Sequence, residues 1–240
     1  MSNIEKFLEM VQESDNIVFF GGAGVSTESG IPDFRSVDGL YNQKYDYPQE
    51  TILSHTFYMR HTEEFYRFYR DKMLCLDAKP NVTHQKLAEL EAAGKVKAVI
   101  TQNIDGLHQM AGSRRVLELH GSVHRNYCQK CGKGFDAEYI LKSGTEIPLC
   151  DACGGKIKPD VVLYEEGLNQ QTLEDAVFYI SHADVLIIGG TSLAVYPAAG
   201  LIDYYRGNKL VLINKSTTPM DGRADLLIQA GLGEVFSQIR

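Results

Sequence analysis

Five cysteines are present, and four of them form two matched pairs whose spacing suits metal binding. The pairs are Cys128-x-x-Cys131 and Cys150-x-x-Cys153, with residues 132–149 between them. Each pair can present two thiolates from one tight turn, and two pairs complete the tetrahedral set that Zn²⁺ prefers. A redox role for either motif is the alternative, but it would leave the matching second pair unexplained. Because four thiolates fill the coordination sphere, the spacing predicts one structural zinc ion per chain.

His120 is the candidate general base, because it follows the apolar run 116–119 and precedes Gly121. A histidine at the end of a strand can accept a proton near neutral pH. The chain has seven histidines, so six others compete for this role, and a purely structural histidine is the alternative. Position alone leaves the assignment open.

Polar side chains also follow the apolar run 96–100. Gln102, Asn103 and Asp105 offer amide and acid groups, which suit recognition of an uncharged carboxamide and of ribose hydroxyls. A polar turn held by its own hydrogen bonds is the alternative. Two further apolar runs end in groups that could lie along the adenosine half of a dinucleotide or form ordinary loops, namely Gly190, Thr191, Ser192, Asn214 and Lys215.

A glycine-rich loop, Gly21 to Gly24, follows the apolar run 17–20. Glycines at this position let the backbone approach a phosphate, and a following helix would offer free N–H groups. A tight turn without a ligand is the alternative. The loop departs from the dehydrogenase fingerprint, because Thr27 stands at the third glycine position and no acidic strand end follows about 20 residues later.

The next loop, 29–35, is kept from being helical by its glycine and proline. Asp33 and Arg35 could grip ribose hydroxyls, a phosphate or each other, and Phe34 could cover the face of a reactive ring. A surface loop with an incidental ion pair is the alternative.

These groups need a scaffold that brings strand ends together. Short β-branched apolar runs alternate with stretches of helical periodicity, a pattern typical of a parallel sheet with helices on both faces. The expected strands are 17–20, 96–100, 116–119, 161–163, 185–188 and 210–213, and the expected helices are 4–13, 83–93, 169–181, 196–206 and 232–240. The sequence therefore predicts a doubly wound, Rossmann-type α/β domain, whose ligands bind at the carboxyl ends of the strands.

Two stretches break this alternation. Residues 37–80 are aromatic-rich and mostly helical, and residues 124–158 contain the four paired cysteines. We expect them to form a smaller second domain, as a helical insertion and a zinc-binding ribbon. The Rossmann-type domain would then comprise residues 1–36, 81–123 and 159–240.

Composition is that of an ordinary globular protein, with 44% hydrophobic and 23% charged residues. The net charge of -7 gives no electrostatic case for direct nucleic-acid binding. Residues 1–16 do not resemble a signal peptide, and no apolar run approaches the roughly 20 residues that span a membrane. We expect a cytoplasmic protein without membrane contact, whose reduced cysteines bind metal instead of forming disulfides.

In chain order, these motifs resemble those of the sirtuins, in their bacterial form with a single catalytic core. The resemblance rests on the two cysteine pairs and on four motifs: GAGVSTESGIPDFR at 22–35, TQNIDGLH at 101–108, HG at 120–121 and GTSLAV at 190–195. It extends from about Gly21 to Asn214, which is nearly the whole chain. It implies an enzyme that consumes NAD to remove acyl groups from protein lysine side chains.

The resemblance also implies residue roles. The family's general base is the histidine of the HG motif, here His120, while Asn103 and Asp105 would hold the nicotinamide and its ribose. The acyl oxygen would attack C1′ of that ribose as nicotinamide leaves, and His120 would then activate a ribose hydroxyl. The products would be free lysine, nicotinamide and O-acyl-ADP-ribose. The implied NAD contacts are Gly22, Ala23, Thr27, Asp33, Phe34, Arg35, Gln102, Asn103, Ile104, Asp105, Gly190, Thr191, Ser192, Asn214 and Lys215.

Substrate contacts follow from the same resemblance. In sirtuins the region matching 158–168 pairs by its backbone with the substrate peptide. Val162 and Tyr164 are the implied peptide contacts, with Val162 against the acyl-lysine stem. Glu165 stands where the family usually has glycine. If that position requires a positive φ, Glu165 is strained or the loop differs.

An expectation about the acyl group comes from residues 64–70. Sirtuins that prefer succinyl- or malonyl-lysine carry a tyrosine followed three residues later by an arginine, one helical turn on. Here Tyr66 is followed at that distance by Tyr69, although Arg70 could still approach the same face. We therefore expect a preference for acetyl-lysine, with Tyr66 and Tyr69 beside the acyl group.

Other functions use parts of the same pattern. The site could transfer ADP-ribose to a protein side chain without deacylation, which product analysis would distinguish. A zinc-ribbon binding module with a degenerate NAD pocket is disfavoured by the intact His120, Asn103 and Asp105, and a dehydrogenase by Thr27. The expected partner is acylated lysine in a protein or peptide, and the expected oligomeric state is a monomer.

Overall fold

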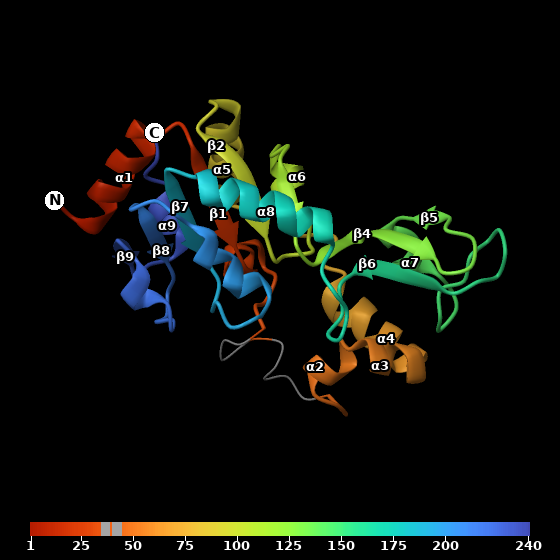
Figure 1. The fold of residues 1–240 in the computed structure, drawn as a ribbon. Coiled ribbons are helices and arrows are strands. Elements are labelled where there is room, and N and C mark those ends of the chain that lie inside the picture. The colour runs from red at the N-terminus through yellow and green to blue at the C-terminus, as the bar shows by residue number, and fades with distance from the viewer. Residues whose placement is uncertain (35–38, 40–44) are drawn as a thin grey trace.

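The computed structural model describes residues 1–34, 39 and 45–240. Its larger sheet has six strands in the order β3-β2-β1-β7-β8-β9, and every neighbouring pair is parallel. The strands are β1 Ile17–Gly21, β2 Val96–Thr101, β3 Val116–Glu118, β7 Val185–Gly189, β8 Leu210–Ile213 and β9 Leu226–Ile228. The strand order reverses between β1 and β7 (Figure 1), so the predicted doubly wound fold is confirmed.

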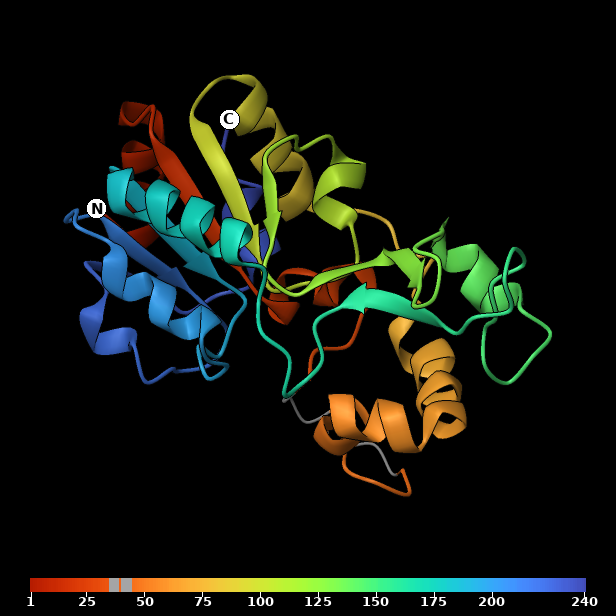
Figure 2. The ribbon, with the colours of Figure 1, turned by 45° about the vertical axis from the view of Figure 1, so that its right-hand side comes forward.

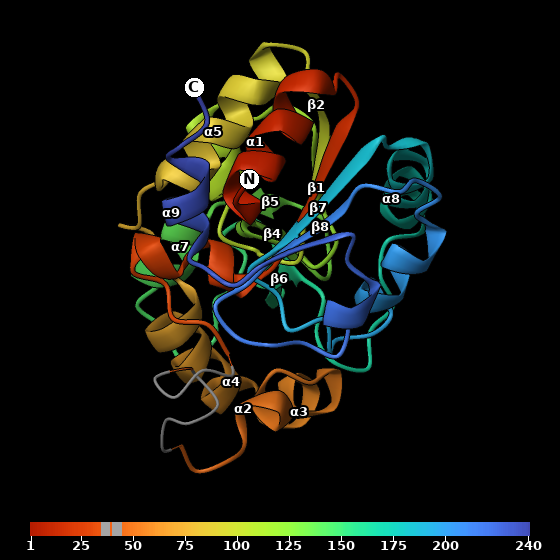
Figure 3. The same ribbon diagram turned by 90° about the vertical axis from the view of Figure 1, so that its left-hand side faces the viewer.

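Helices cover both faces of this sheet. On one side lie α1 Asn3–Glu13, α5 Val82–Ala92 and α9 Leu232–Phe236, and on the other lies α8 Gln170–His182 (Figure 3). Alternate residues of β1 divide between the two layers, because successive side chains of a strand point to opposite faces. Ile17 and Phe19 pack in the first apolar cluster, and Val18 and Phe20 pack in the second.

A smaller antiparallel sheet extends away from the first, in the order β5-β4-β6 (Figure 2). Its strands are β4 Gly121–Cys128, β5 Gly134–Phe135 and β6 Ile157–Val161. A third apolar cluster joins this sheet to short helices, which are α2 Gln49–Ile52, α3 His55–Arg60, α4 Thr62–Phe68 and α7 Ala137–Lys142. A π-helical turn, Tyr69–Met73, continues α4.

Some expectations about the elements were wrong or incomplete. Residues 161–163 do not form a parallel strand, because only Val161 lies in a strand and that strand is the antiparallel β6. An apolar run does not reveal which sheet it joins, since either sheet would bury it. The expected helix 196–206 is a 3₁₀ helix over Ala198–Tyr204, and β9 was not expected.

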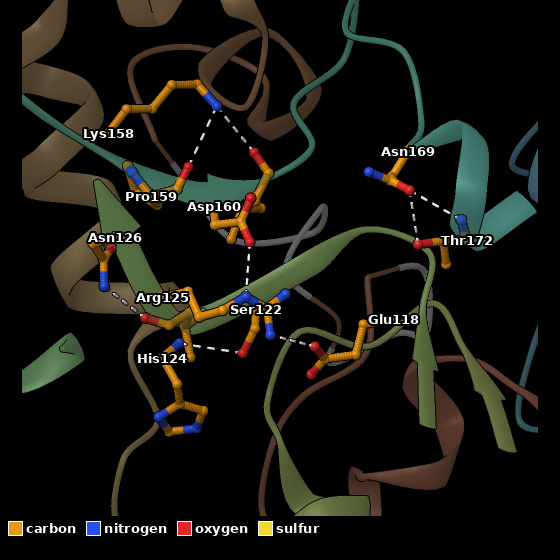
Figure 4. Close-up of polar contacts among 12 residues, drawn as sticks. Glu118, Ser122, His124, Arg125, Asn126, Lys158, Pro159, Asp160, Asn169 and Thr172 are labelled. Atoms are coloured by element: carbon orange, nitrogen blue, oxygen red, sulfur yellow. Dashed lines mark hydrogen bonds and ion pairs between the residues drawn. The ribbon is translucent and has the colours of Figure 1, made fainter. Parts of the chain in front are cut away.

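Local sequence signals set the starts of several helices. Ser2 and Glu5 form a capping box at the start of α1, and the Asn81 side chain caps α5. Asn169 caps α8, because its side-chain oxygen accepts a hydrogen bond from the Thr172 N–H at 2.9 Å (Figure 4). Among the described helices, none has both the length and the apolar character needed to cross a membrane.

Candidate active site

A cavity of about 840 Å³ lies at the carboxyl ends of β1, β2, β7 and β8, next to the β4–β6 sheet. This is where a doubly wound fold binds its ligands. The predicted site residues that line it are Ala23, Thr27, Asp33, Phe34, Gln102, Asn103, Ile104, Asp105, His120, Val162, Tyr164, Gly190, Thr191, Ser192, Asn214 and Lys215. Folding therefore gathers motifs from both ends of the chain around one space.

Two predicted NAD contacts remain to be accounted for. Arg35 lies outside the described residues. Gly22 is absent from the described cavity lining. Its N–H donates to the Gly189 carbonyl at 3.2 Å, and a Cβ on Gly22 would lie 2.7 Å from the Thr191 Cβ. Gly22 therefore allows close packing of two strand ends, and the prediction of direct contact is not supported by this geometry.

Several lining residues escaped the sequence analysis. The end of the helical segment contributes Lys72, Met73, Cys75 and Leu76 to the cavity. Nothing in their local pattern indicates that they meet a cavity, because the face that a short helical turn exposes is decided by packing against distant segments. Ser26 also lines the cavity, and it belongs to a motif whose other members were singled out.

The imidazole of His120 is held in one orientation. Its Nδ1 lies 3.0 Å from the Gln102 carbonyl oxygen. Because a carbonyl can only accept, Nδ1 carries the hydrogen and Nε2 keeps a lone pair. Burial lowers the pKa of His120 below its usual value, and the hydrogen bond to Gln102 partly opposes this effect. The ring is therefore neutral at pH 7 and can accept a proton at Nε2.

Ser26 links Asn103 and Asp105, two of the polar residues that follow β2. Its Oγ donates to Asp105 Oδ2 at 2.6 Å, and Asn103 Nδ2 donates to the same Oγ at 3.0 Å. Asp105 Oδ1 accepts from the Leu107 N–H at 2.9 Å, where α6 Leu107–Ala111 begins. Ser26 is almost fully buried. The network fixes an amide and a carboxylate side by side, as recognition of a carboxamide and ribose hydroxyls requires.

Asn214, which also lines the cavity, carries an unused donor. Asn214 Oδ1 accepts from the Thr191 N–H at 3.1 Å. Its Nδ2 is buried and has no hydrogen-bond partner among the described residues. An unsatisfied buried amide costs free energy, so such a group in a cavity fits a ligand with acceptor oxygens. The hydroxyls and phosphates of a dinucleotide provide such acceptors, so the described lining fits NAD.

The loop after β6 is fastened to the helical segment. Tyr164 donates from its N–H to the Leu53 carbonyl at 2.9 Å and accepts from the His55 N–H at 3.0 Å. Val162 donates to the His120 carbonyl at 3.0 Å. Glu165 has a φ of 75°, so the positive φ considered from the sequence is present. Its carboxylate accepts from the Thr56 N–H at 2.8 Å, which lowers the pKa of Glu165.

The expected acyl contacts of Tyr66 and Tyr69 are contradicted. Both side chains are fully buried among aromatic rings, and neither lines the cavity. The Tyr66 hydroxyl donates to the Ile157 carbonyl. The Arg70 guanidinium is bound to the segment 140–146, donating to the carbonyls of Ile140, Thr145 and Glu146 and to Ser143 Oγ. The helix face that carries Tyr66 and Tyr69 therefore packs into the aromatic core of the small domain and not against the cavity.

The four paired cysteines converge outside the cavity. All four Sγ atoms lie within 4.8 Å of one another. Sγ of Cys128 and Cys153 are 3.5 Å apart, and those of Cys131 and Cys150 are 3.6 Å apart. Tetrahedral zinc with Zn–S bonds of about 2.3 Å implies S···S distances of roughly 3.8 Å. The cluster therefore fits a structural zinc ion, as its spacing predicts.

Comparisons with known proteins agree with this geometry. A model of the Sir2 family matches residues 22–197. An NAD-dependent protein deacetylase of Clostridium acetobutylicum is 61% identical over 241 residues, covering 100% of this chain and 98% of that protein. A protein of the same name from Clostridium tetani is 58% identical, with the same coverage.

Solved structures agree as well. A structure described as Sir2 with a p53 peptide and NAD⁺ has a TM-score of 0.88 at 42% identity, covering 100% of this chain and 97% of that one. A structure described as Sir2 bound to acetylated peptide has a TM-score of 0.87 at 40% identity, with the same coverage. The match of the family model and the identity of relatives along the whole chain show that this protein belongs to the Sir2 family.

Proposed function

We propose that this protein removes acetyl groups from lysine side chains of proteins or peptides, consuming one NAD and one water and releasing nicotinamide, O-acetyl-ADP-ribose and free lysine. The observation that carries the proposal is the imidazole of His120, held through Nδ1 in the same cavity as the hydrogen-bonded group Asn103–Ser26–Asp105. The names of the relatives support the same activity.

The cavity lining suggests how NAD is held. Asn103 and Asp105, with Gln102, would bind the nicotinamide and its ribose. Phe34 would stand over this end of the ligand, and Arg35 stays a predicted NAD contact. Bound NAD supplies a C1′–nicotinamide bond that can break, so it acts as a co-substrate and not as a hydride carrier. The adenosine half would lie along Gly190, Thr191, Ser192, Asn214 and Lys215.

His120 would accept a proton from a ribose hydroxyl at Nε2. The Gln102 carbonyl would hold the ring through Nδ1 during this transfer, so that Nε2 faces the reacting group. Val162 and Tyr164 would lie along the acylated peptide. The zinc site lies apart from the cavity and would contribute to folding, because four thiolates leave no position for a reacting water.

The setting of the enzyme is also part of the proposal. We propose a cytoplasmic protein, because four thiolates that bind zinc require a compartment that keeps thiols reduced. We also propose that the protein acts as a monomer. The Rossmann-type domain would comprise residues 1–36, 81–123 and 159–240, and the small domain residues 37–80 and 124–158. Residues 121, 122 and 159–161 also pair in the small sheet, so they connect the two.

Product analysis tests the proposed function. The protein is incubated with an acetyl-lysine peptide and NAD, and the products are followed by mass spectrometry. We expect deacetylated peptide, nicotinamide and O-acetyl-ADP-ribose in equal amounts, and no reaction without NAD. A peptide that gains ADP-ribose and keeps its acetyl group would show that the enzyme is an ADP-ribosyltransferase instead.

A further inference from the structure

β4 contains an insertion opposite its partner strand. On β6, Pro159 and Asp160 are adjacent, and they pair with Asn126 and Ser122 of β4. Residues 123–125 therefore have no partner on β6 and form a bulge, which we call the β4 bulge. Pro159 suits this place because proline cannot donate to a strand ladder.

Two side chains hold the bulge in shape. The fully buried Asn126 donates from Nδ2 to the Val123 carbonyl at 3.0 Å. Ser122 Oγ accepts from the His124 N–H at 3.3 Å (Figure 4). The bulge is thus a defined conformation in which the interrupted ladder is replaced by local hydrogen bonds.

The bulge holds the loop that presents Asp105. Val123 donates from its N–H to the Ile104 carbonyl at 3.0 Å. His124 Nε2 lies 2.9 Å from the Asp105 carbonyl oxygen and must donate, because a carbonyl can only accept. The ring of His124 also packs on Gly106, where a Cβ would lie 2.7 Å from His124 Cδ2. Two successive carbonyls of the loop are therefore bound by successive residues of the bulge.

Arg125 ties the bulge to the segment that carries His120. Its Nη1 donates to Glu118 Oε2 at 2.6 Å, and its Nε donates to Asp160 Oδ2 at 2.8 Å. The side chain of Glu118 is 9% exposed, and its other oxygen accepts from Gln109 Nε2 at 2.8 Å. Because Glu118 ends β3 two residues before His120, these contacts restrain the turn on which His120 stands.

Figure 4 shows that the side chains of His124 and Arg125 point in different directions. Arg125 reaches toward Asp160 of β6 and toward Glu118, while the ring of His124 points away from β6. The two neighbouring side chains therefore contact two different parts of the active site: His124 contacts the loop of Asp105, and Arg125 contacts Glu118 in the segment before His120.

We propose that His124 and Arg125 are positioning residues, which hold Asp105 and His120 in the mutual geometry that the reaction requires. This inference rests on the proposed function, since it assigns work to those two groups. Neither His124 nor Arg125 is part of the described cavity lining, so each acts through the group it holds. His124 acts on the loop of Asp105 and hence on NAD binding, whereas Arg125 acts on the segment of His120 and hence on turnover.

The first test compares His124→Leu with His124→Gln, by calorimetric titration with NAD. Leucine removes the donor, so we expect NAD binding about tenfold weaker, the effect of losing one hydrogen bond. Glutamine can place an amide N–H near the position of Nε2, so we expect binding within about threefold of the wild type. His182→Leu, at an exposed histidine of α8, is the matched control and should bind NAD normally. Unchanged NAD binding in His124→Leu, or equal weakening by leucine and glutamine, would overturn the role of His124.

The second test uses Arg125→Met, which keeps the apolar stem and removes both ion pairs. We expect kcat on an acetyl-lysine peptide to fall roughly 10- to 100-fold, as small displacements of a catalytic group do, with NAD affinity within twofold. Arg223→Met, which removes the exposed ion pair with Asp203, is the matched control. Thermal unfolding establishes that the variants are folded. A normal kcat in Arg125→Met would refute its role.

These readouts separate the two proposals. NAD binding and thermal unfolding require no turnover. A wild-type protein that binds NAD without deacetylating the peptide would contradict the proposed function, while the His124 variants would still report on the positioning of the Asp105 loop.

Discussion

His120 can act as a base only while its Nε2 is unprotonated. Burial lowers the pKa of its imidazole, so the neutral form persists to lower pH than for an exposed histidine. Protonation begins as the pH falls toward this lowered pKa, which lies below the ordinary value of about 6.5. We expect kcat/KM to be constant above that value and to fall as the pH decreases through the lowered pKa.

Replacing His120 by alanine should abolish the base and leave the cavity. Removal of a general base typically costs about 10²- to 10⁴-fold in rate. We expect kcat to fall by at least this factor, while NAD still binds, since the proposed NAD contacts lie on other strand ends. Kinetics and calorimetric titration check the two parts. Wild-type-like deacetylation by His120→Ala would remove His120 from the mechanism.

Glu165 combines an unfavourable backbone with a favourable side-chain contact. Its φ of 75° is costly for a residue with a Cβ, and its carboxylate accepts the Thr56 N–H at the start of α3. Glu165→Ala keeps the strain and loses the contact, whereas Glu165→Gly loses both. We expect the glycine variant to unfold at a temperature roughly 2–4 °C above that of the alanine variant. Equal melting temperatures would show that the position is unstrained.

At the scale of elements, the two cysteine turns depend on each other through the metal. The site cannot exist in the unfolded chain, so zinc binding contributes directly to folding. We expect one zinc ion per chain, and we expect Cys150→Ala to lose the metal and to unfold at lower temperature. Metal analysis of protein purified without chelators measures the zinc content of the wild type and of Cys150→Ala. Calorimetry measures their unfolding temperatures. Zinc-free wild-type protein of full stability would disprove the assignment.

Helices α5 and α6 meet through two buried histidines, His84 and His108, whose ring centroids are 4.7 Å apart. Burial lowers the pKa of His84 to about 4, opposed by the charge of Asp105. Burial, with the neighbouring His84, lowers the pKa of His108 to about 3. Both lie below the unfolded value near 6.5, so the unfolded chain takes up protons first as the pH falls.

The free energy of unfolding is therefore unaffected by the titration of these two groups above about pH 6.5, and it decreases as the pH falls toward 4. We expect the melting temperature to decrease between pH 7.5 and pH 5, and His108→Gln to flatten this decrease. Thermal unfolding across that range is the measurement, with the exposed His182→Gln as a control of wild-type slope. An unchanged slope in His108→Gln would count against the pair.

At the scale of the whole molecule, we expect acyl preference to depend on how the helical segment packs against the cavity. Tyr66, Tyr69 and Arg70 all point into the small domain, so none offers a partner to an acyl carboxylate. A charge-assisted hydrogen bond is worth about 1.5–3 kcal/mol, so we expect kcat/KM for acetyl-lysine to exceed that for succinyl-lysine by roughly 10- to 100-fold. Rates on one peptide with each acyl group provide the test. Comparable desuccinylation would contradict it and would direct attention to Lys72, which lines the cavity.

The sequence by itself determined the zinc ligand set, the carboxyl ends of β1, β2, β7 and β8, and the family. Those signals are local: two Cys-x-x-Cys pairs define a tetrahedral set by short spacing, and apolar runs ending in polar motifs mark strands and their carboxyl ends. The Sir2 family inferred from those motifs is confirmed. The individual NAD and peptide contacts stay predictions, although most of the residues concerned line the cavity.

Only the tertiary structure decided what depends on pairing between distant segments. The apolar run at 161–163 could be buried in either sheet. Val161 pairs with β4 because of the register between β4 and β6, and this register cannot be inferred from the local sequence pattern. Tyr66 and Tyr69 were assigned to the acyl group from the resemblance to sirtuins and the spacing of that family's motif, but the face that meets the cavity is set by the aromatic core around them. The contacts of His124 and Arg125 with the active site depend on the β4 bulge. A bulge is defined only by comparison with the partner strand, so the sequence of β4 alone does not reveal it.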